Sequence, residues 1–154
     1  MMPRSVEITV ENRQNIAVDT GRLSVRLAES IRAEGPVEGE LIIALVDDVE
    51  MQRINCEFLD HDWPTDVVSF SYVEETDSAD SRIDGELVVS VDTAQRQARQ
   101  HGWSLDDELL LYCVHGFLHL RGYDDLTDDA RVQMRQRECE LLGRIGLVPQ
   151  GLPS

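Results

Sequence analysis

The apolar residues of the N-terminal half follow first the period of a strand and then the period of a helix. Every second residue is apolar in 6–10, and Leu23, Leu27 and Ile31 recur at four-residue spacing. The nearly continuous apolar run ELIIALV, residues 40–46, is typical of a central strand that is buried on both faces. The pattern therefore predicts a strand, a helix and a second strand, in that order.

The middle of the chain continues with one helix and two strands. Asp47 or Asp48 can cap a helix whose apolar face begins at Met51. The runs VVSFSY and GELVVSV, residues 67–72 and 85–91, are rich in β-branched residues and predict two strands. The acidic stretch between these runs predicts a loop.

Three helices should complete the chain, at about 92–101, 105–121 and 128–142. Residues that favour helix starts and stops flank them: Ser104 and Thr127 as caps, and Gly102 and Gly122 as stops. We expect one α+β domain that spans residues 1–154, with a small mixed sheet of about four strands and about five helices.

The charge of the chain restricts its partners. The formal net charge of -16 argues against a general nucleic-acid-binding surface, because cationic side chains supply most of the non-specific affinity for phosphates. The acid is unevenly spread, since residues 1–90 hold 20 of the 30 acidic residues and only 7 of the 14 basic ones. All the basic residues are arginine, which suits bidentate contacts with phosphate but also fits a bias in genome composition.

The N-terminal residues, the lengths of the apolar runs and the cysteine pattern together favour a cytoplasmic location. The N-terminus MMPRSVEITV has no apolar core of a signal peptide, and no run approaches the length of a membrane span, so we expect a cytoplasmic protein without a membrane partner. Its three cysteines, Cys56, Cys113 and Cys139, lie far apart within apolar helical patterns. We expect them to be reduced, buried thiols.

The segment HGFLHLRGYDD, residues 115–125, carries the candidate chemistry. On a helix, His115 and His119 project from the same face one turn apart, so both imidazoles can reach one metal ion. Gly122 can end the helix and turn the chain back, so that Asp124 or Asp125 can supply a third ligand. Three ligands and an open position are typical of catalytic zinc, although such a histidine pair alone is more often two satisfied polar residues.

The same segment resembles the signature H-G-x-L-H-L-x-G-Y-D-H of the YbeY family, which are metal-dependent endoribonucleases and rRNA maturation factors. Residues 54–70, INCEFLDHDWPTDVVSF, resemble a second motif of that family, and residues 84–90, DGELVVS, resemble one of its strands. The resemblance covers roughly residues 40–142. It implies a compact α+β fold with a metzincin-like metal helix near the C-terminal end.

The resemblance also implies a function and a ligand set. Carried across residue by residue, it gives His115, His119 and Asp125 as metal ligands and catalytic residues, with one zinc ion per chain. The implied activity is single-strand-specific RNA cleavage in 16S rRNA 3′-end processing and ribosome quality control. The implied partners are single-stranded RNA or rRNA and the small ribosomal subunit or its assembly proteins, and no DNA.

Two departures from the family pattern affect this expectation. Asp125 stands where the family has its third histidine, so another first-row metal such as iron or manganese is an alternative to zinc. Leu59 stands where the family has an arginine, and Arg53 or Arg121 are the candidates to replace that cation. We expect Asp124, which matches the family's own aspartate, to orient the turn rather than to bind the metal.

The same residues favour some classes of reaction over others. Metalloproteases with an H-E-x-x-H motif carry a glutamate base after the first histidine, and Gly116 occupies that position here, so a protease is disfavoured. We expect metal-assisted phosphodiester cleavage, by water or by the 2′-hydroxyl of the RNA. The leading alternative is a ribosome-assembly or RNA-binding factor that keeps the fold and has lost catalysis. A non-haem iron oxygenase is a weaker one, because the predicted sheet is too small for its usual barrel.

Further polar and aromatic residues of the motifs are weaker candidates for the site. Thr65 and Asp66 follow a proline and are more often turn formers, and Ser69 and Phe70 lie on a strand that could line a substrate groove. We expect His61 and His101 to be exposed. The arginines of the last helix alternate with acidic residues, which is typical of a solvated face.

Overall fold

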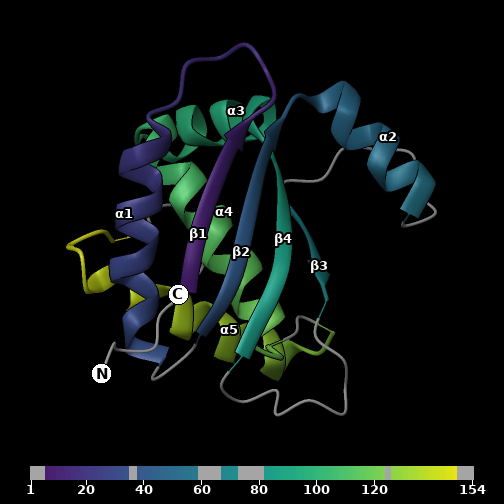
Figure 1. The fold of residues 1–154 in the computed structure, drawn as a ribbon. Coiled ribbons are helices and arrows are strands. Elements are labelled where there is room, and N and C mark those ends of the chain that lie inside the picture. The colour runs from purple at the N-terminus through teal and green to yellow at the C-terminus, as the bar shows by residue number, and fades with distance from the viewer. Residues whose placement is uncertain (1–5, 35–37, 59–66, 73–81, 124–125, 149–154) are drawn as a thin grey trace.

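The structure, a computed structural model, describes residues 6–34, 38–58, 67–72, 82–123 and 126–148 (Figure 1). The elements in chain order are β1 (Val6–Asn12), α1 (Thr20–Ile31), the short 3-10 helix η1 (Arg32–Glu34), β2 (Glu38–Val46), α2 (Asp48–Phe58), β3 (Val67–Ser71), β4 (Arg82–Ser90), α3 (Val91–His101), α4 (Leu105–Leu120) and α5 (Asp128–Gly143). The predicted α+β class, with four strands and five α-helices in the described residues, is confirmed.

The four strands form one mixed sheet in the order β1-β2-β4-β3. β1, β2 and β4 run parallel, and β3 pairs antiparallel with β4 at the edge. The central pair, β2 and β4, carries the two longest apolar runs of the sheet, as expected for strands that are covered on both faces. The edge position of β3 leaves one side of this strand without a partner strand in the described part of the sheet.

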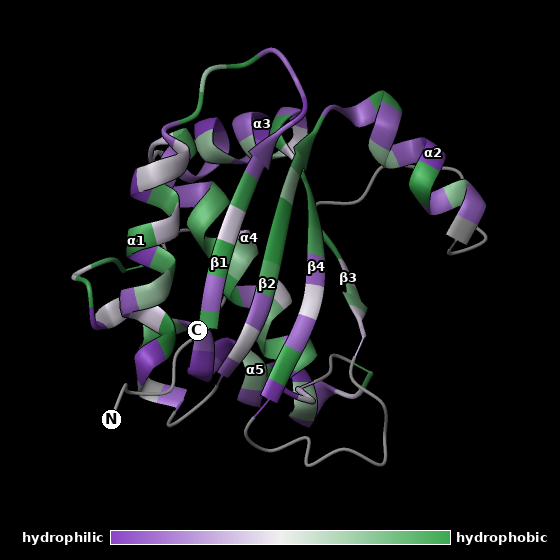
Figure 2. Ribbon diagram, viewed as in Figure 1, coloured by the Kyte–Doolittle hydropathy of each residue, from purple (hydrophilic) through white to green (hydrophobic). Residues whose placement is uncertain are grey.

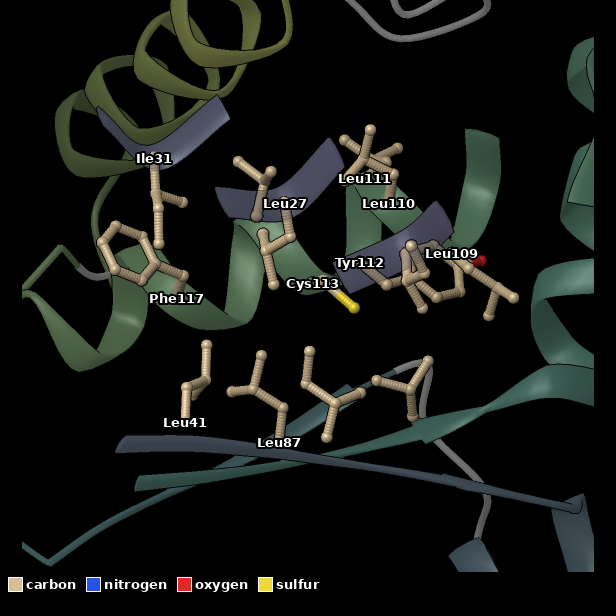
Figure 3. Packing of buried hydrophobic residues seen from close by; sticks show 14 of the residues in the cluster. Leu27, Ile31, Leu41, Leu87, Leu109, Leu110, Leu111, Tyr112, Cys113 and Phe117 are labelled. Atoms are coloured by element: carbon tan, nitrogen blue, oxygen red, sulfur yellow. The ribbon is translucent and has the colours of Figure 1, made fainter. Parts of the chain in front are cut away.

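The main core lies between one face of the sheet and helices α1, α3, α4 and α5. Figure 3 shows Leu27 of α1 and Phe117 of α4 on one side of this layer and Leu41 and Leu87 of the sheet on the other. All four side chains are fully buried. Burying a side chain of this size contributes roughly 1.5–3 kcal/mol, so this layer fixes α4 against the sheet.

A smaller core covers the opposite face of the sheet. Because side chains alternate along a strand, Ala44 and Val46 point away from the main core and pack with Met51 and Ile54 of α2 and with Val88. Figures 1 and 2 show α2 standing at one end of the sheet, with many hydrophilic residues along its length. The site-bearing helix α4 therefore lies in the thicker of the two layers.

The predicted helix signals are confirmed where the structure describes them. The side chains of Asp47, Ser104 and Thr127 accept hydrogen bonds from backbone amides three residues later, at 2.8, 3.1 and 3.0 Å. Gly102 ends α3 with a φ of 74°. The largest boundary error is in β4, which begins at Arg82 rather than at the predicted residue 85.

The prediction for the cysteines is confirmed in one respect and wrong in another. All three are free thiols, but Cys56 and Cys139 are exposed and only Cys113 is buried. Cys56 and Cys139 lie on helix faces that no other described element covers. Helical spacing shows that a residue shares a face with apolar neighbours, but it does not show what covers that face. Burial raises the pKa of the Cys113 thiol to about 12.

This difference in exposure predicts the thiol reactivity of the folded protein. A thiol reagent such as DTNB at pH 8 should label two of the three cysteines in the folded protein, Cys56 and Cys139. Because the thiolate is the reactive form, Cys139 should react more slowly than Cys56, since partial burial and the Glu138 carboxylate raise the pKa of the Cys139 thiol. Cys113 should react only after denaturation. Three reactive thiols in the native protein would contradict the packing of α4, and the Cys113→Ala variant should retain both reactive thiols.

None of the described helices combines the length and the apolar character that crossing a membrane requires.

Candidate metal centre

Helix α4 is buried along most of its length, and the candidate ligands are its polar exceptions. Every residue from Leu109 to Val114 and from Gly116 to Leu118 is buried. His115 and His119 are half-buried, so this apolar helix presents two imidazoles at the boundary of the core. The strongly apolar surroundings hold the backbone beneath both rings.

The two histidines meet as the sequence predicts. The Nε2 atoms of His115 and His119 lie 3.1 Å apart, and the rings are 4.7 Å apart between centroids at an angle of 80°. Two nitrogens bound to one tetrahedral zinc at about 2.0–2.1 Å are separated by roughly 3.4 Å, so small ring movements would bring both into range. The described pair fits two ligands of one ion.

The third predicted ligand, Asp125, lies outside the described residues, as does Asp124. Within the described part of the chain, no group of three or more histidine, cysteine, aspartate or glutamate residues is placed to hold a metal ion. The structure therefore shows that two of the three predicted side chains lie close together, and the ligand set His115, His119 and Asp125 stays a prediction.

The turn after α4 is the one that the sequence predicts. Gly122 has a φ of 100°, a conformation that residues with a Cβ rarely adopt. The Gly122 amide donates to the carbonyl of His119 at 3.1 Å, and the Tyr123 amide donates to the carbonyl of Leu118 at 3.0 Å. The helix therefore ends at Leu120, one residue after the second histidine, and the positive φ of Gly122 changes the direction of the chain.

One contact of the site was missed by the sequence-based analysis. Glu138 of α5 is 5% exposed, and its Oε1 lies within hydrogen-bond distance of Nδ1 of His115. The signal was available, because Glu138 follows the buried Met134 by four residues and precedes the buried Leu141 by three. The many charges of this helix suggested a solvated face and hid the one acid that points inward.

A pocket of about 360 Å³ lies among α3, α4 and α5 and reaches His115 and Glu138. The expectation that His101 is exposed is wrong: its side chain is 17% exposed, and its Nδ1 lies 3.2 Å from Oε2 of the buried Glu108. Trp103 donates to the same oxygen. The other oxygen of Glu108 has no hydrogen-bond partner among the described residues. His61 lies outside the described residues.

The edge strand β3 runs beside α4. The hydroxyl of Ser69 donates to the carbonyl of Gly116 at 3.3 Å, which fixes the strand one residue from His115. Phe70 packs against the smaller core on the other face of the sheet. Thr65 and Asp66 lie outside the described residues and stay predictions. In the described part of the sheet, β3 is the edge strand on the side of the histidine pair.

Gly116 explains why a protease base does not fit here. A Cβ at Gly116 would lie 2.8 Å and 3.1 Å from the methyl groups of Leu87, and 3.2 Å from a methyl of Val67. Leu87 is fully buried, so this position faces the sheet rather than the histidine pair. A glutamate would have to enter the apolar core, away from the histidine pair.

The packing at Gly116 predicts that Gly116→Glu lowers the free energy of unfolding by roughly 3 kcal/mol or more and creates no peptidase activity. Urea unfolding measures the effect. The matched control is Gly143→Glu, because a Cβ at Gly143 meets no atom within 4 Å, and its stability should stay within about 1 kcal/mol of wild type. Equal stabilities of the two variants would contradict the close contact between α4 and the sheet.

The two arginines considered as substitutes for the family's cation both have carboxylate partners. Arg53 of α2 pairs with Glu50 and Glu57, each at 2.5 Å. Arg121 lies 3.7 Å from Glu34. Leu59 itself lies outside the described residues. Two carboxylates neutralise Arg53, which argues against it as a phosphate ligand. Arg121 shares Glu34 with Arg137, which lies 2.5 Å from the same carboxylate, so the role of Arg121 stays a prediction.

Comparisons with known proteins agree with this fold and with the motif. The family model described as Endoribonuclease YbeY matches residues 6–146. A relative from Bacillus licheniformis, named Endoribonuclease YbeY, is 38% identical over 149 residues, which cover 86% of this chain and 94% of the relative. One of the same name from Syntrophotalea carbinolica is 40% identical and covers 90% of this chain and 95% of its own length.

A solved structure shares the architecture. The solution structure of TM1509 from Thermotoga maritima aligns with a TM-score of 0.61 and 27% sequence identity, over 91% of this chain and 88% of that one. The matches reach beyond the quoted motifs into the N-terminal strand and helix. The resemblance predicted from residues 40–142 is thereby confirmed, and the chain belongs to the Endoribonuclease YbeY family.

Proposed function

We propose that this chain is a metal-dependent endoribonuclease that cleaves single-stranded RNA in the cytoplasm during rRNA maturation. The family supports the activity, since relatives that match nearly the whole chain are named endoribonucleases. The observation that carries the metal assignment is the pair of Nε2 atoms, 3.1 Å apart at the end of a buried helix. Within rRNA maturation, we assign it to 16S rRNA 3′-end processing and to ribosome quality control.

His115, His119 and Asp125 would hold the ion, which we take to be zinc, with another first-row metal as the alternative. When bound, such an ion supplies Lewis-acid stabilisation of the negative charge that develops on the phosphoryl group. The carboxylate of Asp125 makes the centre formally less positive than three histidines would. The attacking oxygen is either a water or the 2′-hydroxyl of the RNA.

The charge distribution supports delivery of the RNA by a partner. With a net charge of -16 and no lysine, the isolated chain should bind random RNA weakly. The C-terminal part, which carries the histidine pair, is the less acidic part, so RNA can approach the pair with less repulsion. We assign the partner to the small ribosomal subunit or to one of its assembly proteins.

The test is cleavage of three substrates of the same sequence: single-stranded RNA, duplex RNA and single-stranded DNA. We expect cleavage of the single-stranded RNA alone, its loss after the metal is removed with a chelator, and its return when zinc is added. Cleavage that persists in metal-free protein would contradict the metal-dependent mechanism. Cleavage of the DNA would exclude a nucleophile supplied by the 2′-hydroxyl.

A second candidate is an assembly factor that has lost catalysis. Two substitutions favour it: Asp125 for the family's histidine and Leu59 for its arginine. This function predicts that the protein binds small-subunit precursors but cuts none of the three substrates at any metal concentration. The same assay therefore separates the two candidates.

A further inference from the structure

We propose that Glu138 is a positioning residue that holds the imidazole of His115 in the tautomer and orientation needed to bind the metal. This inference rests on the proposed function, because it assigns a role toward the ion held by His115 and His119. It concerns a residue of α5, outside both sequence motifs that mark the site.

The burial and the contact of Glu138 carry the first step. Its side chain is 6% exposed, against 29% for His115, so the carboxylate lies on the protein side of the ring and the opposite ring edge lies nearer to solvent. Glu138 shares the inward face of α5 with Met134 and Leu141, which are both buried. A carboxylate is expensive to bury among apolar side chains unless it has a partner, and the partner here is the ring of His115.

The chemistry of the contact is the second step. A carboxylate oxygen accepts, so Nδ1 of His115 carries the proton and donates to Oε1 of Glu138. Nε2 of the same ring then carries a lone pair and no proton, and this atom faces Nε2 of His119 at 3.1 Å. A hydrogen bond between the two rings then requires the proton to lie on Nε2 of His119. A metal ion requires the same lone pair, so Glu138 prepares His115 for metal binding.

Helix α5 contains its own control. Glu140 lies two residues after Glu138 and points outward, since its side chain is 62% exposed and it pairs with Arg137 at 2.7 Å. The two glutamates carry the same side chain and lie on the same helix, but they lie on opposite faces of it. Among the described contacts, Glu138 touches the candidate ligand His115, and Glu140 pairs with Arg137.

The pocket of about 360 Å³ bears on how strongly the loss of Glu138 should weaken zinc binding. It reaches both His115 and Glu138, so a water molecule can replace a lost acceptor at Nδ1. Removing the acceptor should therefore weaken zinc binding by about 10–100-fold rather than abolish it, which is the usual cost of losing such a partner.

The experiment compares Glu138→Leu and Glu138→Gln with Glu140→Leu and Glu140→Gln. Zinc affinity is measured by competition with a chromophoric chelator, and the imidazole nitrogens of the metal-free protein are followed by ¹⁵N NMR. We expect Glu138→Leu to weaken zinc binding by about 10–100-fold and to remove the signature of the Nδ1–H tautomer at His115. Glu138→Gln keeps an acceptor oxygen and should retain most of the affinity, and both Glu140 variants should match wild type.

The thermal stability of the metal-free variants separates positioning from packing. Leucine fills a similar volume among Met134 and Leu141, so Glu138→Leu should melt at or above the wild-type temperature while its zinc affinity falls. A variant that loses stability and zinc affinity together would assign Glu138 to packing and overturn the proposal.

Two further outcomes would overturn the Glu138 role. One is an unchanged zinc affinity in Glu138→Leu. The other is an Nε2–H tautomer of His115 in the wild-type protein, and this measurement does not depend on the folding of any variant. If the wild-type protein binds zinc and cleaves RNA, either result rejects the positioning role of Glu138 and leaves the proposed function intact. If the wild-type protein binds no zinc, the proposed metal site is rejected. The tautomer of His115 would still show whether Glu138 holds the imidazole ring.

Discussion

Replacing His119 with alanine should remove the bound metal and lower the rate of single-stranded RNA cleavage by more than about 100-fold. Losing a direct ligand should cost more than losing an outer partner of a ligand, for which about 10–100-fold is typical. Nε2 of His119 lies 3.1 Å from Nε2 of His115, so alanine leaves one described ligand instead of two. Elemental analysis and a gel assay on a labelled RNA measure both effects.

His101→Asn is the matched control, since it removes a histidine that does not belong to the pair. Nδ2 of asparagine can replace Nδ1 of His101 as the donor to Glu108, which keeps the buried carboxylate satisfied. We expect this variant to keep its metal and its activity. A His119→Ala protein that retains stoichiometric metal would show that the histidine pair is a hydrogen-bonded pair of polar residues and no metal centre.

Replacing Asp125 with alanine should also reduce metal binding and cleavage together, whereas Asp125→His should preserve both. The family pattern has histidine at this position, and exchanging a carboxylate for a neutral imidazole makes the metal formally more positive. We therefore expect Asp125→His to cleave RNA at least as fast as wild type, and Asp125→Ala to bind zinc at least about 10-fold more weakly. Zinc competition and initial cleavage rates measure the two effects.

Asp124→Ala provides the comparison, because the neighbouring aspartate is assigned to the turn. It should weaken zinc binding less than Asp125→Ala does. If Asp125→Ala keeps full metal and activity while Asp124→Ala loses both, the third ligand is Asp124 and the residue-by-residue transfer from the family motif is wrong at this position.

The parts of the fold that follow from local chemistry could be predicted from the sequence. Ser104 and Gly122 mark the two ends of α4 because a cap and a positive φ depend on residues next to the helix. The strands of the central pair were found for the same reason, since each carries its own apolar run. The facing of His115 and His119 follows from helix geometry alone.

The parts that depend on what covers a helix could not be predicted. Cys56 and Cys139 share helical spacing with apolar residues, but the structure leaves both exposed. His101 was expected to be exposed because it has no partner on its own helix, and its partner Glu108 belongs to the next one. The spacing of Glu138 from Met134 and Leu141 indicates that it points inward, but its partner lies 23 residues away on another helix, and helical spacing does not identify that partner.

The most direct test of the central claim is elemental analysis of the purified wild-type protein, with cleavage of single-stranded RNA assayed on the same sample. A metal centre that catalyses RNA cleavage predicts about one zinc or other first-row metal ion per chain, and cleavage that falls in proportion as the ion is removed. A protein that contains no bound metal and still cuts the RNA would contradict it.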